Sequence, residues 1–152
     1  MIDESSVSCE KTLIDAPAET VWAVLVDFEA YGAWNEFCPQ MKGELTMGAP
    51  LEMQVNLGHG LQEQVEYITC IEAPHKIVWS MRNLPDDPIH ANRTQLIESI
   101  DATHCSYWSI DAFEGKAVAA MMKAMAEEVE RGFALCAEGL KREAERRYRE
   151  SK

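Results

Sequence analysis

Membrane and export signals are missing from this 152-residue chain. No apolar run reaches about 18 residues, so no segment is predicted to cross a bilayer. The first residues include the acids Asp3 and Glu4, whereas a signal peptide begins with basic residues and an apolar stretch. These absences predict a cytoplasmic protein that does not insert into membranes.

Metal-binding and disulfide patterns are also absent. The five cysteines are scattered without a Cys-x-x-Cys pair, which is typical of reduced, mostly buried thiols. The four histidines lie far apart and form no zinc-binding pattern. The chain has no phosphate-binding glycine loop, no Ser-His-Asp arrangement and no paired glycosidase carboxylates. We therefore expect no metal and no cofactor.

Positive charge is scarce, because 14 basic residues stand against 26 acidic ones and the net charge is −12. Such a field repels phosphate backbones, so nucleic acid is not expected as a partner. Residues 141–152 differ from the rest, with six basic side chains and three glutamates. This segment is either a docking tail or, more commonly for such runs, a solvated helix end whose cations complement the helix dipole. We expect it to project into solvent.

No linker rich in Gly, Ser or Pro divides the chain, so residues 1–152 are predicted to form one domain. Residues 7–14 favour a strand. Pro17 then marks the start of a short helix to residue 25, and residues 28–34 favour another helical turn. Six strands are predicted next, separated by turn residues, at 41–46, 50–57, 61–71, 76–82, 93–100 and 105–113.

A long helix is predicted from residue 116 to about residue 147, a stretch that contains no proline. Its apolar residues recur every three or four positions, at Val118, Met121, Met122, Met125, Val129, Phe133, Cys136 and Leu140. Gly132 and Gly139 mark places where this helix can bend or make close contacts. A sheet followed by one amphipathic helix indicates an α+β domain in which the helix lies across one sheet face.

Several motifs resemble the START-like, or polyketide cyclase/dehydrase, superfamily. Residues 15–22 and 27–37 are similar to its patterns Ala-Pro-x-Glu-x-Val-Trp and Asp-Phe-x-x-Tyr-x-x-Trp-Asn-Pro-Phe. Residues 73–79 are similar to Pro-x-Arg-Leu-x-Trp. Phe113 and Gly115 match the Phe-x-Gly that closes the last strand before the long helix. The motifs occur in the family's order and span nearly the whole chain.

The resemblance implies a helix-grip fold, in which a seven-stranded curved antiparallel sheet wraps around the long C-terminal helix. It also implies two short helices after the first strand and a cavity that takes a small hydrophobic or aromatic ligand. Two departures from the family pattern affect this expectation. Glu36 replaces a proline, and Arg93 and Gln95 replace an inward histidine and phenylalanine. The cavity is therefore predicted to be more polar than is usual in the family.

Side-chain alternation along the strands selects candidate ligand-binding residues. If the last strand follows the family, its odd-numbered residues from 107 to 113 face the helix. The candidates from the strands, the helix and the cavity mouth are Trp34, Phe37, Trp79, Met81, Gln95, Ser109, Phe113, Met121 and Met125. The apolar residues in this set are also ordinary core residues, so packing is the competing interpretation.

Four residues are candidates for acid/base chemistry: Arg93, Tyr107, Asp111 and His90. The turn at residues 101–104 makes Arg93 and Asp111 cross-strand neighbours, which predicts an ion pair at the cavity wall. Such a pair either orients a ligand or is purely structural, and a carboxylate in an apolar pocket can also act as a base. His90 lies in a long loop from which it could reach the cavity mouth.

Three functions fit the sequence. The first is binding of a small hydrophobic or aromatic ligand, polyketide-like or lipid-like, in an internal cavity. The second is an enzyme of the polyketide cyclase or dehydratase type that acts on such a ligand. The third is a protein-interaction module that uses the acidic surface or the basic helix end. The sequence leaves the oligomeric state and the choice between carrier and enzyme open.

Overall fold

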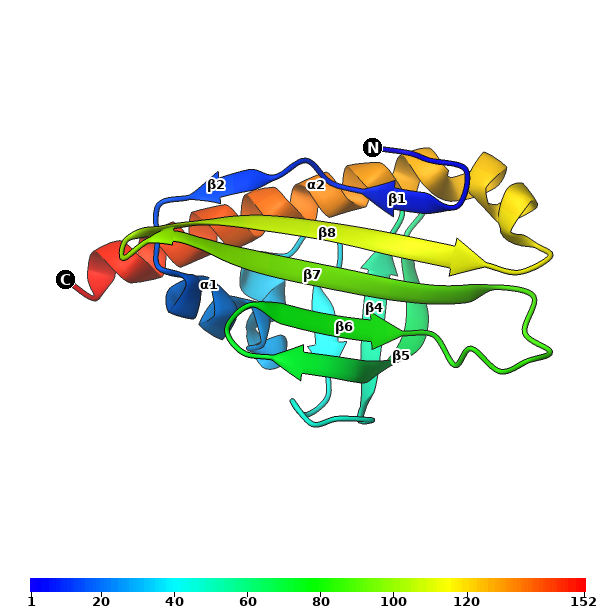
Figure 1. Cartoon of the computed structure of the whole chain (residues 1–152), viewed down its shortest axis with the longest axis horizontal. Helices are drawn as coiled ribbons and strands as arrows, with labels where there is room; N and C mark the ends of the chain where they lie inside the picture. The colour runs from blue at the N-terminus through cyan, green and yellow to red at the C-terminus, as the bar shows by residue number, and fades with distance from the viewer.

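The computed structural model describes all 152 residues and confirms the α+β helix-grip architecture (Figure 1). The strands are β1 (Ser6–Ser8), β2 (Thr12–Ile14), β3 (Gln40–Lys42), β4 (Pro50–Asn56), β5 (Leu61–Glu72), β6 (Lys76–Ser80), β7 (His90–Asp101) and β8 (His104–Glu114). The helices are α1 (Ala18–Leu25), the 3-10 helix η1 (Phe28–Ala33) and α2 (Val118–Glu150). In Figure 1, α2 runs along the length of the molecule behind β8. None of these helices is long and apolar enough to cross a membrane.

The strands form one antiparallel sheet in the order β1-β8-β7-β6-β5-β4-β3, with β2 also paired to β8. The first strand, expected to be continuous at residues 7–14, is divided in two. Ser8 lies opposite Ile110 and Thr12 lies opposite Tyr107. Between these two pairs the N-terminal segment advances four residues while β8 advances three. The extra residue is a β-bulge, which interrupts the pairing and bends the strand.

The remaining predicted strands are present with shifted ends. The strand expected at residues 41–46 ends at Lys42, because the chain turns there and Thr46 N donates to Glu44 O at 2.9 Å. The strand expected to begin at Arg93 begins instead at His90. His90 therefore belongs to the sheet and not to the preceding loop.

Two glycines let α2 pack close to the segment that follows η1. A Cβ atom at Gly132 would lie 2.1 Å from the ring of Phe37, and one at Gly139 would lie 2.0 Å from the carbonyl oxygen of Trp34. A side chain at either position would force its neighbour to move, and at Gly139 that neighbour is backbone, so the glycines allow this close packing. The expectation of close contacts at the two glycines is confirmed.

The C-terminal part of α2 does not project freely into solvent, contrary to the expectation for residues 141–152. Ala144 is fully buried and Glu143 is 8% exposed, and only the last residues, 149–152, are all exposed. Lys141 Nζ donates to the carbonyl oxygen of Leu13 at 2.9 Å. The helix end packs on the N-terminal segment because its acids and bases neutralise one another locally, which lowers the cost of burying them.

Candidate ligand cavity

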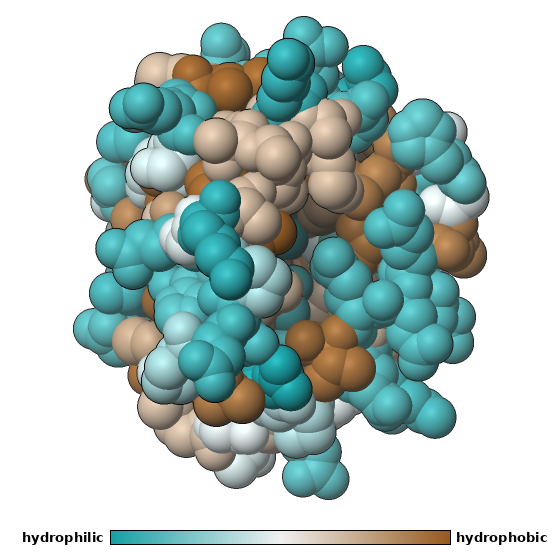
Figure 2. All heavy atoms as spheres, turned by 90° about the vertical axis from the view of Figure 1, so that its right-hand side faces the viewer, coloured by the Kyte–Doolittle hydropathy of each residue, from teal (hydrophilic) through white to brown (hydrophobic).

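A cavity of about 200 Å³ lies between the inner face of the sheet and α2. A water molecule takes about 30 Å³ in the liquid, so this volume corresponds to about seven waters, and because the cavity is partly open a larger ligand can extend beyond it. Hydrophobic side chains make up 17 of its 23 lining residues, so an apolar molecule suits it better than water does. Figure 2 views the end where the loop after β6 and the start of α2 lie, and it shows a hollow there.

The cavity forms where the sheet carries a small side chain. Ala91 on β7 lies opposite Phe113 on β8, and its carbonyl oxygen accepts a hydrogen bond from Met81 N at 3.0 Å. Two residues further along the same strands, Arg93 lies opposite Asp111. Because Ala91 is buried and ends in a methyl group, the larger side chains around it enclose free volume instead of filling it.

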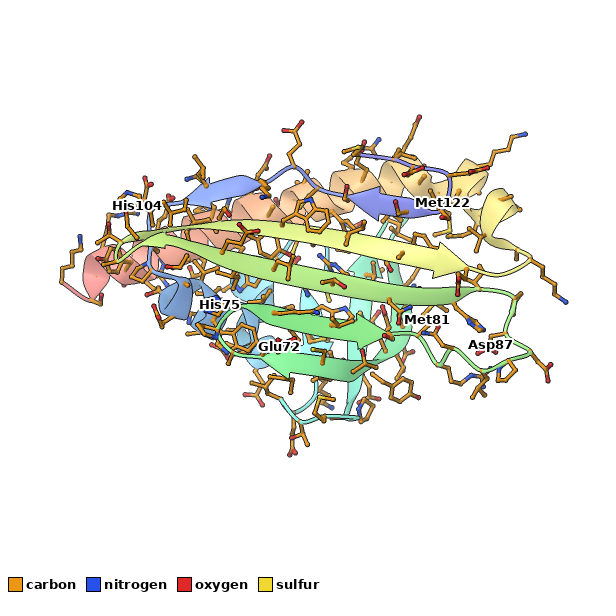
Figure 3. The ribbon with its side chains drawn as sticks, viewed as in Figure 1. Glu72, His75, Met81, Asp87, His104 and Met122 are labelled. Atoms are coloured by element: carbon orange, nitrogen blue, oxygen red, sulfur yellow. The ribbon has the colours of Figure 1, made fainter.

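Seven of the predicted ligand-binding residues line this cavity. They are Phe37, Trp79, Met81, Gln95, Phe113, Met121 and Met125. Met81 is 38% exposed, and Figure 3 shows it at the end of β6, next to the loop that carries Asp87. Met121 and Met125 lie four residues apart on α2 and so share one face of that helix. Strand alternation and helix period together aim these side chains at one space.

Trp34 and Ser109 lie elsewhere, which removes them from the candidate ligand-binding set. The ring of Trp34 packs on Tyr31, with 4.9 Å between ring centroids, and its backbone lies against Gly139 of α2. Ser109 is fully buried beside the β-bulge, where its backbone N donates to Cys9 Sγ at 3.3 Å. Both residues contribute to packing at places where the cavity does not extend.

Arg93 and Asp111 are cross-strand neighbours that line the cavity, but the predicted ion pair between them is not present. The guanidinium of Arg93 instead lies over the ring of Phe133, 4.3 Å from its centroid, and Nη2 donates to Cys136 Sγ at 3.8 Å. Asp111 Oδ1 has no hydrogen-bond partner. The aromatic and sulfur groups of α2 draw the cation away from its neighbour, because an aromatic face attracts a guanidinium.

The other two acid/base candidates do not reach the cavity. Tyr107 is fully buried, and its hydroxyl donates to Gln95 Oε1 at 2.6 Å. The His90 ring lies near the loop instead, with Nε2 2.7 Å from the carbonyl oxygen of Leu84. Tyr107 still affects the cavity through Gln95. Because the Tyr107 hydroxyl binds Gln95 Oε1, the NH₂ group of the Gln95 amide points away from Tyr107.

Glu66 on β5 is a cavity residue that the sequence interpretation missed. It is 9% exposed, and burial raises its pKa from 4.5 to about 8, with a further contribution from the charge of Asp111. Burial likewise raises the pKa of Asp111 to about 7, although the Arg93 cation opposes this shift. Both carboxyl groups can therefore gain or lose a proton near neutral pH.

The alternation of β5 contained a usable signal for Glu66. Ile68 is fully buried, so Glu66, two residues earlier, points to the same inner face of the sheet. The apolar Val65 is 42% exposed on the outer face. In this part of the strand the polar residues face inward and an apolar residue faces outward, which is the reverse of the usual pattern.

Unpartnered polar atoms concentrate at the cavity. Five buried side-chain polar atoms in the protein have no hydrogen-bond partner, and four of them belong to residues that line the cavity. They are Glu66 Oε1, Arg93 Nε, Gln95 Nε2 and Asp111 Oδ1. An unsatisfied buried polar group costs about 1–3 kcal/mol, so the cavity is a place where a ligand can gain hydrogen bonds.

Comparisons with known proteins agree with this geometry. The aromatase/cyclase Zhui from Streptomyces sp. R1128 superimposes with a TM-score of 0.73 at 19% identity, covering 93% of this chain and 94% of that one. A START superfamily protein from Mycobacterium smegmatis gives 0.63 at 16% identity, with coverages of 97% and 99%. Norcoclaurine synthase from Thalictrum flavum gives 0.68 at 12% identity, again with 97% and 99%. At these identities the likeness concerns the fold.

No curated protein matches the chain in sequence. A family match does exist, and it extends over residues 6–145, from β1 almost to the end of α2. The match therefore contains the whole sheet and every cavity residue described above. The chain belongs to the family described as polyketide cyclase/dehydrase and lipid transport.

Proposed function

We propose that the protein binds a small, mostly apolar ligand in the cavity between the sheet and α2. The observation that carries this proposal is a partly open cavity whose lining is hydrophobic at 17 of 23 residues. Burying apolar ligand surface gains about 25 cal/mol per Å², and a preformed cavity requires little reorganisation to do so. A few polar groups at one wall would then orient the ligand.

The family description supports a polyketide-like or lipid-like ligand, because it names both cyclase/dehydrase activity and lipid transport. The Streptomyces relative is an aromatase/cyclase by name, which favours an aromatic ligand. An interaction module would need no such cavity, so that alternative gains no support from the interior of the domain. Ligand binding is the function common to the carrier and enzyme alternatives.

An enzyme of the cyclase or dehydratase type is the second candidate. Glu66 and Asp111 favour it, because carboxyl groups with pKa values of about 8 and about 7 are suited to proton transfer at neutral pH. A carrier needs no such groups. Turnover of a bound poly-β-ketone that is lost in a Glu66→Gln, Asp111→Asn double variant would favour the enzyme, whereas unchanged release of the ligand would favour the carrier.

Binding of the neutral dye Nile red tests the proposed function directly. We expect its fluorescence to rise with the wild-type protein. Met125→Trp, which adds bulk on the cavity face of α2, should weaken binding at least about tenfold. Lys123→Trp is the matched control, because residue 123 lies on the exposed face of the same helix. Equal binding by all three proteins would contradict the proposal.

A further inference from the structure

We propose that the polar residues of the cavity (Glu66, Arg93, Gln95 and Asp111) select a neutral ligand. This ligand carries both a hydrogen-bond donor and a hydrogen-bond acceptor, such as a hydroxyl and a carbonyl. Asp111 accepts from the donor, and Glu66, in its protonated form, donates to the acceptor. This inference rests on the proposed function and narrows it, because it sets fatty acids and amines apart from the preferred ligand.

The charge balance of the cavity is the first argument. Arg93 is always cationic, and Glu66 and Asp111 are the two acids that line the same space. These three groups sum to zero charge when one acid keeps its proton, and the pKa values of about 8 for Glu66 and about 7 for Asp111 favour Glu66 as the protonated one. A neutral ligand leaves this balance unchanged. A carboxylate would require a second proton in the cavity, and an ammonium group would require the loss of the first.

The other titratable groups at the cavity do not alter this balance. Burial raises the pKa of Cys38 to about 12 and raises the pKa of Tyr31 well above its ordinary value, so both side chains stay neutral. Cys136 Sγ accepts hydrogen bonds from Asn35 Nδ2 at 3.6 Å and from Arg93 Nη2 at 3.8 Å. These contacts hold the guanidinium in place on the α2 side of the cavity.

The mixture of unpartnered atoms is the second argument. Arg93 Nε and Gln95 Nε2 are donors without acceptors. Glu66 Oε1 and Asp111 Oδ1 are carboxyl oxygens that have no hydrogen-bond partner. A fatty-acid carboxylate supplies acceptors alone, and an ammonium group supplies donors alone. A ligand with a hydroxyl and a carbonyl supplies both and can satisfy both kinds of atom, which avoids the cost of leaving buried polar groups unpaired.

The position of these atoms is the third argument. Asp111 lies opposite Arg93, and Glu66 lies on β5, on the other side of β6 and β7. The buried Ala91 lies on β7 between these two acids in the strand order and lines the same cavity. A ligand above Ala91 therefore has an acid on each side, while Met121 and Met125 of α2 cover its apolar part.

A matched pair of ligands tests the inference on the unmodified protein. 4′-Hydroxyflavone carries a hydroxyl at the far end of the molecule from its carbonyl, so the two groups can reach acids on opposite sides, and flavone has the same skeleton without the hydroxyl. We expect 4′-hydroxyflavone to bind about tenfold more tightly at neutral pH, the effect of one additional hydrogen bond to a charged partner. Dodecanoate and dodecylammonium, used as competitors, should displace it only weakly.

The result separates the inference from the proposed function. Equal affinity for the two flavones, or stronger binding of dodecanoate, would overturn the donor-and-acceptor ligand class and leave apolar ligand binding intact. Absence of binding by both flavones and by Nile red would overturn both proposals.

Three variants then assign the roles. Asp111→Ala removes the acceptor and should abolish the preference for 4′-hydroxyflavone. Glu66→Gln should keep the preference, because an amide donates a hydrogen bond as a protonated carboxyl does. Glu63→Ala, on the exposed outer face of the same strand, is the control and should change nothing. Loss of the preference in Glu66→Gln, or its survival in Asp111→Ala, would overturn the assigned roles.

Discussion

The C-terminal part of α2 (residues 139–150, the closed end) and the cavity each contain one buried glutamate. The pKa values of these two carboxyl groups are shifted in opposite directions. Glu143 is 8% exposed and Glu66 is 9% exposed. Glu143 accepts hydrogen bonds from Arg146 and Arg147 at 2.8–2.9 Å, and these partners lower its pKa to about 2. Glu66 has no partner for its buried oxygen, and burial raises its pKa to about 8. The two glutamates have similar exposed fractions, but Glu143 is covered by its own partly exposed arginine partners, whereas Glu66 lies inside the cavity without such a partner.

Packing differs between the two regions in the same way. Leu140 and Ala144, in the C-terminal part of α2, are fully buried. Met121, Met125 and Val129, in its N-terminal part, are only partly buried and line the cavity. The closed end is closely packed, whereas the cavity end leaves free volume that the proposed ligand would fill.

The largest expected effect comes from adding one methyl group at the closed end. Gly139→Ala places a Cβ 2.0 Å from the backbone oxygen of Trp34, so we expect a loss of about 3 kcal/mol in the free energy of unfolding. Gly132→Ala meets the ring of Phe37, which borders the cavity and has space to move, so about 1 kcal/mol is expected. Chemical denaturation measures both, and equal losses would contradict the difference in packing.

The two buried glutamates should respond to the same substitution with opposite signs. Glu143→Gln weakens charge-assisted hydrogen bonds and should cost about 2 kcal/mol in unfolding free energy. Glu66→Gln removes an unpaired buried charge and should stabilise the protein at pH 8, by on the order of 2 kcal/mol. Unfolding in urea at that pH provides the measurement. Destabilisation by both variants would show that Glu66 has a structural partner.

Glu143 and Glu66 contribute to the pH dependence of stability with opposite signs, and Asp111, whose pKa is raised to about 7, contributes in the same direction as Glu66. The pKa of Glu143 is lowered to about 2, so its contribution is complete above its ordinary pKa of 4.5 and is lost as the pH falls towards 2. The pKa of Glu66 is raised to about 8, so stability is greatest below pH 4.5 and is lost as the pH rises through 8. We expect Glu66→Gln to reduce the loss of stability between pH 4.5 and 8 and to leave the profile below pH 4.5 unchanged. A variant profile that parallels the wild type above pH 5 would contradict this assignment.

The smallest expected effect is that of Asp111→Asn. Asp111→Asn breaks no ion pair, and its two effects oppose each other: it removes a carboxylate that burial disfavours, and it removes a charge that attracts the Arg93 cation, so the unfolding free energy should change by less than about 1 kcal/mol. Differential scanning calorimetry at pH 7 is sufficient to detect a larger change. A loss of about 3 kcal/mol in the unfolding free energy would support the structural ion pair that the sequence predicted.

Local signals made most of the fold predictable from the sequence. Pro17 marked the start of the first helix, the three-and-four spacing marked α2, and the turn at residues 101–104 set the register that places Arg93 opposite Asp111. Gly115 was recognisable as a motif, but its reason is tertiary. Its φ is 129°, and a Cβ there would lie 2.3 Å from the carbonyl oxygen of Pro88.

The candidate cavity could be predicted only in part, because alternation fixes the face of a side chain and not its partner. Register placed Arg93 beside Asp111, yet the guanidinium turns to Phe133, which lies 40 residues later in the chain. Glu66 was missed because hydrophobic patterning assigns apolar residues such as Val65 to the interior, and here the acid takes that place. Partners that come from distant segments are set by tertiary packing.

Methionine methyl groups offer the most direct test of ligand binding in the cavity, because the chain has eight methionines and only some of them line the cavity. Those that line the cavity are Met41, Met53, Met81, Met121 and Met125. Met1, Met47 and Met122 do not line it. Addition of 4′-hydroxyflavone to protein labelled at the methionine methyl carbons should shift the NMR signals of the first group and leave those of the second unchanged. Shifts confined to Met1 and Met47, both exposed at the surface, would show surface binding and contradict the proposed cavity site.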